Sequence, residues 1–130
     1  MIKFGYTILY VKDVSKSVSF YEDAFGFKAK FVSPDNQYGE LKTGDTTLSF
    51  AAIELAQSNL PDGFTQSNLA DKPFAIEIGF VTDNVQQALD TAVENGATLA
   101  AKPKTKPWGQ MVAYIRDLDG FLIELCTPMG

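Results

Sequence analysis

Residues 6–14 read YTILYVKDV, and residues 77–85 read EIGFVTDNV. Setting one segment against the other pairs Tyr6 with Glu77, and the offset stays constant along the whole length. Each segment begins with the β-branched and aromatic residues that are typical of a strand and ends at a polar residue that can cap a helix. A strand followed by a helix, occurring twice in one chain, indicates an internal duplication.

The same order of elements extends outward from both copies. The predicted helices are capped by Asp13 or Ser15 and by Asp83 or Asn84, and they end at Gly26 and Gly96. The predicted strands are 3–11, 27–32, 36–43 and 46–53 in the first copy and 74–81, 97–102, 110–116 and 121–127 in the second. We therefore predict an α+β fold with two βαβββ modules, residues 1–53 and 74–130, within one domain spanning residues 1–130. The polar, turn-rich residues 54–73 between them form a linker or a flap.

Alternation along the strands separates two faces. The apolar positions Leu48, Phe50, Ile76, Ile78, Phe80, Phe121, Ile123 and Leu125 should pack under the helices. The opposite faces carry Tyr6, Ser49, Glu77 and Glu124. If the two modules join into one curved mixed sheet, these four side chains point into a common cleft.

Composition excludes several classes of function. The 130 residues are 45% hydrophobic, enough for one substantial core, and the net charge of −5 argues against nucleic-acid binding. The absence of histidine excludes catalytic triads and metal sites that need imidazole ligands from this chain. A single cysteine permits no internal disulfide, and residues 1–5 lack the apolar run of a signal or membrane segment. A cytoplasmic protein without a membrane partner is the expectation.

Four segments carry a resemblance to a known family. They are YTILYVKDVSKSVSFYEDAFGF (6–27), EIGFVTDNVQQAL (77–89), PWGQ (107–110) and RDLDGFLIEL (116–125). The chain resembles the vicinal oxygen chelate superfamily, which includes glyoxalase I, bleomycin-resistance proteins, fosfomycin-resistance enzymes and extradiol dioxygenases. The last segment is similar to the family's D-P-D-G-x-x-x-E-L, with Leu118 in place of proline. The resemblance implies a homodimer and a site for a small molecule.

The resemblance also implies four ligand positions, which fall on Tyr6, Ser49, Glu77 and Glu124. Relatives that use a metal commonly have histidine or glutamine at the position of Tyr6, glutamate at that of Ser49, histidine at that of Glu77 and glutamate at that of Glu124. Only Glu124 therefore has the family's usual residue. Glu77 and Glu124 with oxygen ligands would suit Mn²⁺, Mg²⁺ or Ca²⁺ better than Zn²⁺, with Ni²⁺ and Zn²⁺ as further candidate cofactors. They would then serve as metal ligand and catalytic base of a glyoxalase-type lyase or isomerase rather than an iron dioxygenase.

Without a metal, Glu77 and Glu124 would attract a neutral or cationic organic molecule, as in the bleomycin-resistance branch, where the drug is sequestered without chemistry. Tyr10, which shares the face of Tyr6, and Trp108 would add aromatic walls for the ligand. For Trp108 the alternative is packing against the sheet edge, and for Glu77 it is a solvated carboxylate. Binding of a small molecule in the cleft is the leading hypothesis, a metal-dependent lyase or isomerase is the alternative, and an interaction module is a third class.

Overall fold

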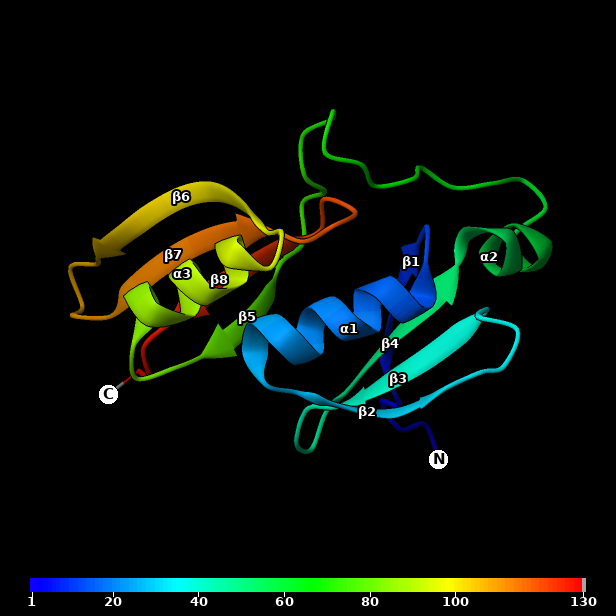
Figure 1. The fold of residues 1–130 in the computed structure, drawn as a ribbon, viewed down its shortest axis with the longest axis horizontal. Helices are drawn as coiled ribbons and strands as arrows, with labels where there is room; N and C mark the ends of the chain where they lie inside the picture. Colours follow the sequence, from blue (N-terminus) through cyan, green and yellow to red (C-terminus); the bar gives the residue numbers. More distant parts are fainter. Residues whose placement is uncertain (130) are drawn as a thin grey trace. The chain divides into compact units, whose positions relative to one another are not determined.

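The computed structural model describes residues 1–129 and contains two successive βαβββ units, as the internal repeat predicts (Figure 1). The first unit covers residues 1–66 and the second begins at Ser67. The elements of the first unit are β1 (Thr7–Val11), α1 (Val14–Phe25), β2 (Lys28–Val32), β3 (Tyr38–Lys42), β4 (Thr47–Ala52) and α2 (Ile53–Asn59). Those of the second are β5 (Ile78–Val81), α3 (Val85–Glu94), β6 (Thr98–Thr105), β7 (Met111–Arg116) and β8 (Leu122–Cys126).

Each unit has its own four-stranded mixed sheet. The strand orders are β1-β4-β3-β2 and β5-β8-β7-β6, so the two sheets have the same topology. The first strand of each unit runs parallel to the last, and the remaining neighbours are antiparallel. This arrangement confirms the α+β class and the duplication. None of the helices within residues 1–129 is long and apolar enough to span a bilayer.

One face of each sheet forms a core under a helix, as the alternation predicts. In the first unit Leu48 and Phe50 are buried, and the ring of Phe50 lies 5.0 Å from that of Tyr21 on α1. In the second unit Ile123 and Leu125 are buried on β8, which α3 covers. The apolar faces of β4 and β8 therefore anchor the helices.

Ile76 does not belong to this core, although the alternation placed it there. It is 66% exposed because the β5–β8 ladder begins at the pair Ile78–Ile123, so Ile76 lies ahead of the sheet. The same effect places Tyr6 and Glu77 immediately before β1 and β5 rather than within them. Propensity alone overestimates the length of both strands, since a strand ends where its neighbour no longer pairs with it.

The helix ends follow the sequence signals. Asp13 caps α1, accepting hydrogen bonds from the Lys16 amide at 3.2 Å and from the Asn36 side chain at 3.1 Å. Gly26 ends the helix in the left-handed conformation, with φ of 76°. Asn84 caps α3 through the Gln87 amide. The contact with Asn36 ties the start of α1 to the β2–β3 turn, which sequence reasoning did not foresee.

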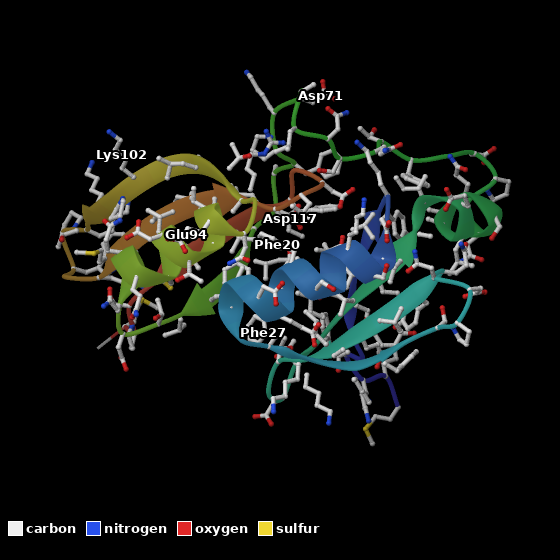
Figure 2. The ribbon with its side chains drawn as sticks, in the orientation of Figure 1. Phe20, Phe27, Asp71, Glu94, Lys102 and Asp117 are labelled. Carbon is white, nitrogen blue, oxygen red and sulfur yellow. The ribbon has the colours of Figure 1, made fainter. Side chains whose placement is uncertain are left out.

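Two elements differ from the prediction. Residues 53–59 form α2, which begins at the last residue of the predicted strand 46–53 and continues into the segment assigned to a linker, because Ile53 and Ala56, one helical turn apart, are both buried. β6 continues past the predicted end at residue 102 to Thr105, so the strand includes Lys104 as well as Lys102. Lys102 is labelled on this strand in Figure 2. The predicted strand ended just before Pro103, because proline donates no hydrogen bond to a ladder, and the ladder between β6 and β7 is irregular there.

The turn between β7 and β8 fastens the end of the connecting segment. Asp117 Oδ1 accepts hydrogen bonds from the amides of Asp119 and Phe121. Arg116 donates to the carbonyls of Gly120 at 2.9 Å and Asn68 at 3.0 Å. The RDLDG motif that carried much of the family resemblance therefore has a structural role, because it closes a hairpin and holds residue 68 against it.

Two glycines with the same φ test whether this turn holds the connecting segment at residue 68. Gly44 and Gly120 both have φ of 91°, but a Cβ at Gly44 meets nothing within 4 Å, whereas one at Gly120 would lie 2.8 Å from Arg116 Nη2 and 2.9 Å from the Asn68 carbonyl carbon. Gly44→Ala should lower the free energy of unfolding by about 1–2 kcal/mol through backbone strain alone. Gly120→Ala should lower the free energy of unfolding distinctly more, as measured by urea unfolding. Equal losses in the two variants would contradict a structural role for the contact between this turn and Asn68.

Candidate functional site

The pairing of β5, β7 and β8 places three residues of the second unit in a row. Glu124 on β8 is paired with Tyr114 on β7 and with Gly79 on β5. Paired residues in adjacent strands share a face, so all three lie on the face opposite the buried Ile123 and Leu125. This face is where the sequence predicted functional residues.

Tyr114 connects the two glutamates of the second unit. Its hydroxyl donates a hydrogen bond of 3.3 Å to Glu124 Oε1 and also interacts with the Glu77 carboxylate. Burial, then Glu77 and then Glu124 raise the pKa of Tyr114 to about 12. The phenol is therefore a neutral donor at physiological pH. We call Glu77, Tyr114 and Glu124 the acidic cluster.

Sequence reasoning missed Tyr114, although a signal for it exists. A tight turn at residues 117–120 sets the register of β7 and β8 and puts residue 114 opposite residue 124. Reading that hairpin outward from the turn would have identified the partner of Glu124. Gln110 was quoted within PWGQ but given no role, because two of its partners, Cys126 on β8 and Thr127 after it, lie far from that segment in the sequence.

A line of polar contacts leads from the acidic cluster to Trp108. The indole Nε1 donates to Gln110 Oε1 at 2.9 Å, and Gln110 Nε2 donates to the Thr127 carbonyl at 2.9 Å. Gln110 also hydrogen-bonds Cys126, whose pKa is raised by burial and by Glu124. Trp108 is 65% exposed in the β6–β7 turn, so its ring is available at the surface.

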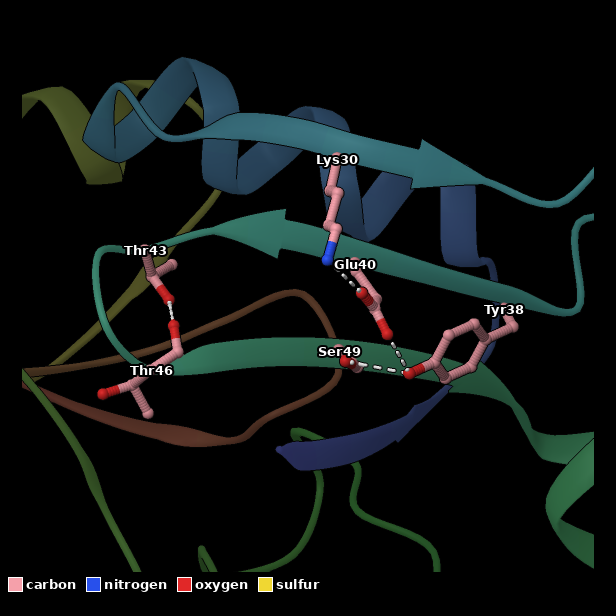
Figure 3. A network of polar contacts seen from close by, with 6 residues as sticks. All are labelled: Lys30, Tyr38, Glu40, Thr43, Thr46 and Ser49. Carbon is pink, nitrogen blue, oxygen red and sulfur yellow. Dashed lines mark hydrogen bonds and ion pairs between the residues drawn. The ribbon is translucent and has the colours of Figure 1, made fainter. Parts of the chain in front are cut away.

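The equivalent face of the first unit has a different chemistry. Ser49 is fully buried, and its Oγ is hydrogen-bonded to the Tyr38 hydroxyl at 3.1 Å (Figure 3). Tyr38 also donates to Glu40 Oε2 at 2.7 Å, and Lys30 Nζ lies 3.6 Å from Glu40 Oε1. Burial is the main cause that raises the pKa of Tyr38. Here the carboxylate is balanced by a lysine, and the serine is enclosed within the network.

Tyr6 and Tyr10 lie at the same end of the chain but have different surroundings. Tyr6 is 55% exposed and close enough to Tyr38 to contribute to its raised pKa. Tyr10 packs edge-on against Phe64, with 4.9 Å between the ring centroids. Phe64 comes from the segment after α2, so part of the predicted flap covers β1 within the first unit.

The structure thus assembles the predicted residues in two separate groups. Glu77, Trp108 and Glu124 belong to the second unit, and Tyr6, Tyr10 and Ser49 belong to the first. Within the second unit, the two glutamates meet at Tyr114. The convergence of both groups in one cleft stays a prediction.

The donor atoms do not fit the metal centre that the family resemblance implies. Ser49 is engaged with Tyr38, and a phenol such as that of Tyr6 is a weak ligand. Within residues 1–129 no group of three or more Cys, Asp or Glu side chains is arranged to hold a metal ion. Glu77 and Glu124 are the strong donors at the predicted positions, and both interact with the Tyr114 hydroxyl.

Comparisons with known proteins agree on a family. The model described as Glyoxalase/Bleomycin resistance protein/Dioxygenase superfamily matches residues 3–125. The protein YraH of Bacillus subtilis (strain 168), described as uncharacterized, is 29% identical over 119 residues, which cover 90% of this chain and 91% of that protein.

Solved structures share the fold at low sequence identity. A glyoxalase-related enzyme from Fulvimarina pelagi has a TM-score of 0.81 at 17% identity and covers 98% of this chain and 89% of its own. The hypothetical protein SA1046 from S. aureus has a TM-score of 0.82 at 24% identity, with coverage of 98% and 95%. A family enzyme from Burkholderia phytofirmans PsJN gives 0.74 at 22% identity, with coverage of 95% and 96%.

The ionisation of Tyr114 tests the geometry of the acidic cluster. Its pKa of about 12 should appear as a late component in the ultraviolet titration of tyrosinate, absent from Tyr114→Phe. Glu77→Gln should move that component down toward the ordinary value of about 10, because a negative neighbour is removed. Titration of Tyr114 together with the ordinary tyrosines in the unaltered protein would contradict the cluster.

The same shift has a consequence for stability. A raised pKa means that the folded state holds the proton more tightly than the unfolded state, so the contribution is complete below about pH 10 and lost as the pH rises to about 12. The unaltered protein should therefore lose stability relative to Tyr114→Phe across that window in urea unfolding. If the free energies of unfolding of the two proteins changed with pH in parallel, the raised pKa of Tyr114 would be contradicted.

Proposed function

The chain belongs to the Glyoxalase/Bleomycin resistance protein/Dioxygenase superfamily, and we propose that it binds a small organic cation at the acidic cluster of the second unit. The observation that carries the proposal is that the Glu77 and Glu124 carboxylates both act on one neutral hydroxyl, that of Tyr114. The proposed role is to hold the cation without converting it, as a sequestering protein does.

Electrostatics supports a positive ligand. Two carboxylates directed at the same hydroxyl repel each other, and an ammonium group beside them would be attracted to both. The hydrogen bond from Tyr114 occupies Glu124 Oε1 and orients the carboxylate before a ligand arrives. The net charge of −5 adds a long-range field of the sign that attracts cations.

An aromatic body on the ligand also has a partner in the second unit. Trp108 is exposed, and its Nε1 is held by Gln110, which itself contacts Cys126 next to the cluster on β8. An indole face attracts both aromatic rings and cations. An arylalkylamine combines the two properties that this surface offers.

A metal-dependent lyase or isomerase that uses Glu77 and Glu124 is the less supported function. It needs further strong ligands, and the position of Ser49 is enclosed by Tyr38 and Glu40 in the first unit. It also needs the carboxylates to exchange their interactions with Tyr114 for a metal ion. Binding of an organic cation uses the cluster as it stands.

Titration calorimetry with benzylammonium tests the proposed function. Glu124→Gln keeps the size of the side chain but removes its charge, so affinity should fall about tenfold, equivalent to about 1.4 kcal/mol. Benzyl alcohol, which has the same ring without the charge, should bind the unaltered protein more weakly than benzylammonium does.

Glu94→Gln is the matched control, because Glu94 is an exposed glutamate on α3 of the same unit (Figure 2). It removes the same charge and should leave the affinity for benzylammonium within about twofold, since distant surface charges are screened. Equal losses of affinity in both variants would show that only the net charge matters. An unchanged affinity in Glu124→Gln would show that the acidic cluster is not the binding site.

A further inference from the structure

The end of α3 carries a pair of groups that can react with each other. Asn95 is the one asparagine of the chain that a glycine follows, and both Asn95 and Gly96 are exposed. The backbone nitrogen of a residue can attack the side-chain carbonyl of a preceding asparagine. A glycine leaves that approach unhindered, because it has no side chain and has the widest choice of backbone angles.

The reaction is a deamidation, with water as the second reactant. The Gly96 nitrogen bonds to Asn95 Cγ while the bond from Cγ to Nδ2 breaks. Ammonia leaves with the proton of the Gly96 amide, and a five-membered succinimide remains. Water then adds to one of the two ring carbonyls and opens the ring to aspartate or isoaspartate.

The folded protein holds these two groups apart. Asn95 has ψ of 7°, which turns the Gly96 nitrogen toward the Asn95 nitrogen and away from the Asn95 side chain. Asn95 Nδ2 donates a hydrogen bond of 2.8 Å to the Thr91 carbonyl, and the Gly96 amide donates to the Val93 carbonyl at 3.1 Å. The leaving group and the attacking nitrogen are therefore both engaged, and the ring can close only after this turn has opened.

Two contacts restrain the opening of the turn. Gly96 has φ of 112°, and the Ala97 amide donates to the Ala92 carbonyl at 3.0 Å, which completes a Schellman motif at the end of α3. Leu118 Cδ2 would lie 3.1 Å from a Cβ at Gly96, so this methyl group of the β7–β8 turn covers the glycine. Residues 93–96 are exposed, and an exposed helix end opens at a lower free energy than the whole unit does.

We propose that Asn95–Gly96 is a site of spontaneous deamidation, which the Schellman motif of α3 and Leu118 keep closed and which reacts with water when the last helical turn opens. The proposal goes beyond ligand binding. It does not depend on the acidic cluster, so the two can fail separately.

The product of the reaction weakens the turn that protects the site. The carboxamide of Asn95 donates to the Thr91 carbonyl, whereas a carboxylate only accepts and would face that carbonyl at the negative end of α3. An isoaspartate also adds a carbon to the main chain within the Schellman motif. Ala97 is buried and leads directly into β6, so the change reaches the packing of α3 on its sheet. Deamidation should therefore lower the stability of the second unit.

Peptide mapping by mass spectrometry after incubation at mildly alkaline pH tests the site. Asn59 is the control within the same chain, because it is also exposed at a helix end but precedes Leu60, whose side chain hinders ring closure. In guanidinium chloride Asn95 should convert about tenfold or more faster than Asn59. In the folded protein the conversion of Asn95 should be about tenfold or more slower than in guanidinium chloride, because the turn is open for a small fraction of the time.

Either comparison can overturn the proposal. Equal conversion of Asn95 and Asn59 in guanidinium chloride would show that Asn95–Gly96 is not a preferred site. Equal conversion of Asn95 in the folded and unfolded protein would show that the end of α3 does not close it.

Leu118→Ala tests whether this side chain restrains the turn. The folded variant should convert Asn95 about threefold or more faster than the unaltered protein, because the opening of the turn no longer breaks a contact with the Leu118 methyl group. Leu99→Ala is the matched control, because Leu99 is exposed to a similar extent in the same unit and no atom of it lies within 4 Å of the Cβ position at Gly96. An equal rate in Leu118→Ala and Leu99→Ala would overturn the restraining role of Leu118.

The dependence on denaturant separates local from global opening. Below the unfolding transition, added guanidinium chloride should hardly change the rate at Asn95, because opening one turn exposes little surface. A rate that rises in proportion to the unfolded fraction would show that only global unfolding exposes the site, and the role of the last turn would be wrong.

Asn95→Asp carries the charge of the product and tests the effect on stability. It should unfold in urea at a lower midpoint than the unaltered protein does. Asn59→Asp makes the same change of charge at the end of α2 and should lower the midpoint less, because Asn95 also loses its hydrogen bond to Thr91. A midpoint for Asn95→Asp that is no lower than that of Asn59→Asp would overturn the link between deamidation and stability.

Discussion

The alternation of side chains along β8 is the constraint on which the site depends. Ile123 and Leu125 are buried against the core under α3, so Glu124 between them must lie on the other face. A shift of one residue in the register would bury the carboxylate and expose two large apolar side chains. The hydrophobic core of the second unit therefore determines where the acidic cluster forms.

The two units use the same topology for different chemistry. In the first, Ser49 is enclosed by Tyr38, and Glu40 is balanced by Lys30 at 3.6 Å. In the second, two carboxylates act on one phenol, so the negative charge remains concentrated beside Tyr114. A network that combines a lysine, a carboxylate and two hydroxyls satisfies itself, whereas two carboxylates around one hydroxyl favour a positive partner. We assign ligand binding to the second unit for this reason.

Much of the fold was accessible from the sequence, because its signals are local. The repeated strand-helix pattern gave the order of elements, Asp13 and Gly26 marked the ends of α1, and Leu48 and Phe50 marked the core face. Strand ends were less accessible, since they depend on the neighbouring strand. Helix α2 was hidden by the polar composition of its surroundings.

The site was predictable only in part. Family resemblance and alternation placed Glu77 and Glu124 on the functional face, but neither identified the group between them. Tyr114 requires the register of the β7–β8 hairpin, which pairs it with Glu124. Such relations between strands are set by tertiary pairing and are not written in the local pattern of either strand.

Mapping of amide chemical shifts by nuclear magnetic resonance during a titration with benzylammonium tests the central assignment most directly. The account predicts that the largest changes occur in β5, β7 and β8 around Tyr114 and Glu124, together with the Trp108 indole. The largest changes within residues 1–66, or a uniform scatter over both units, would contradict the assignment of the ligand site to the acidic cluster.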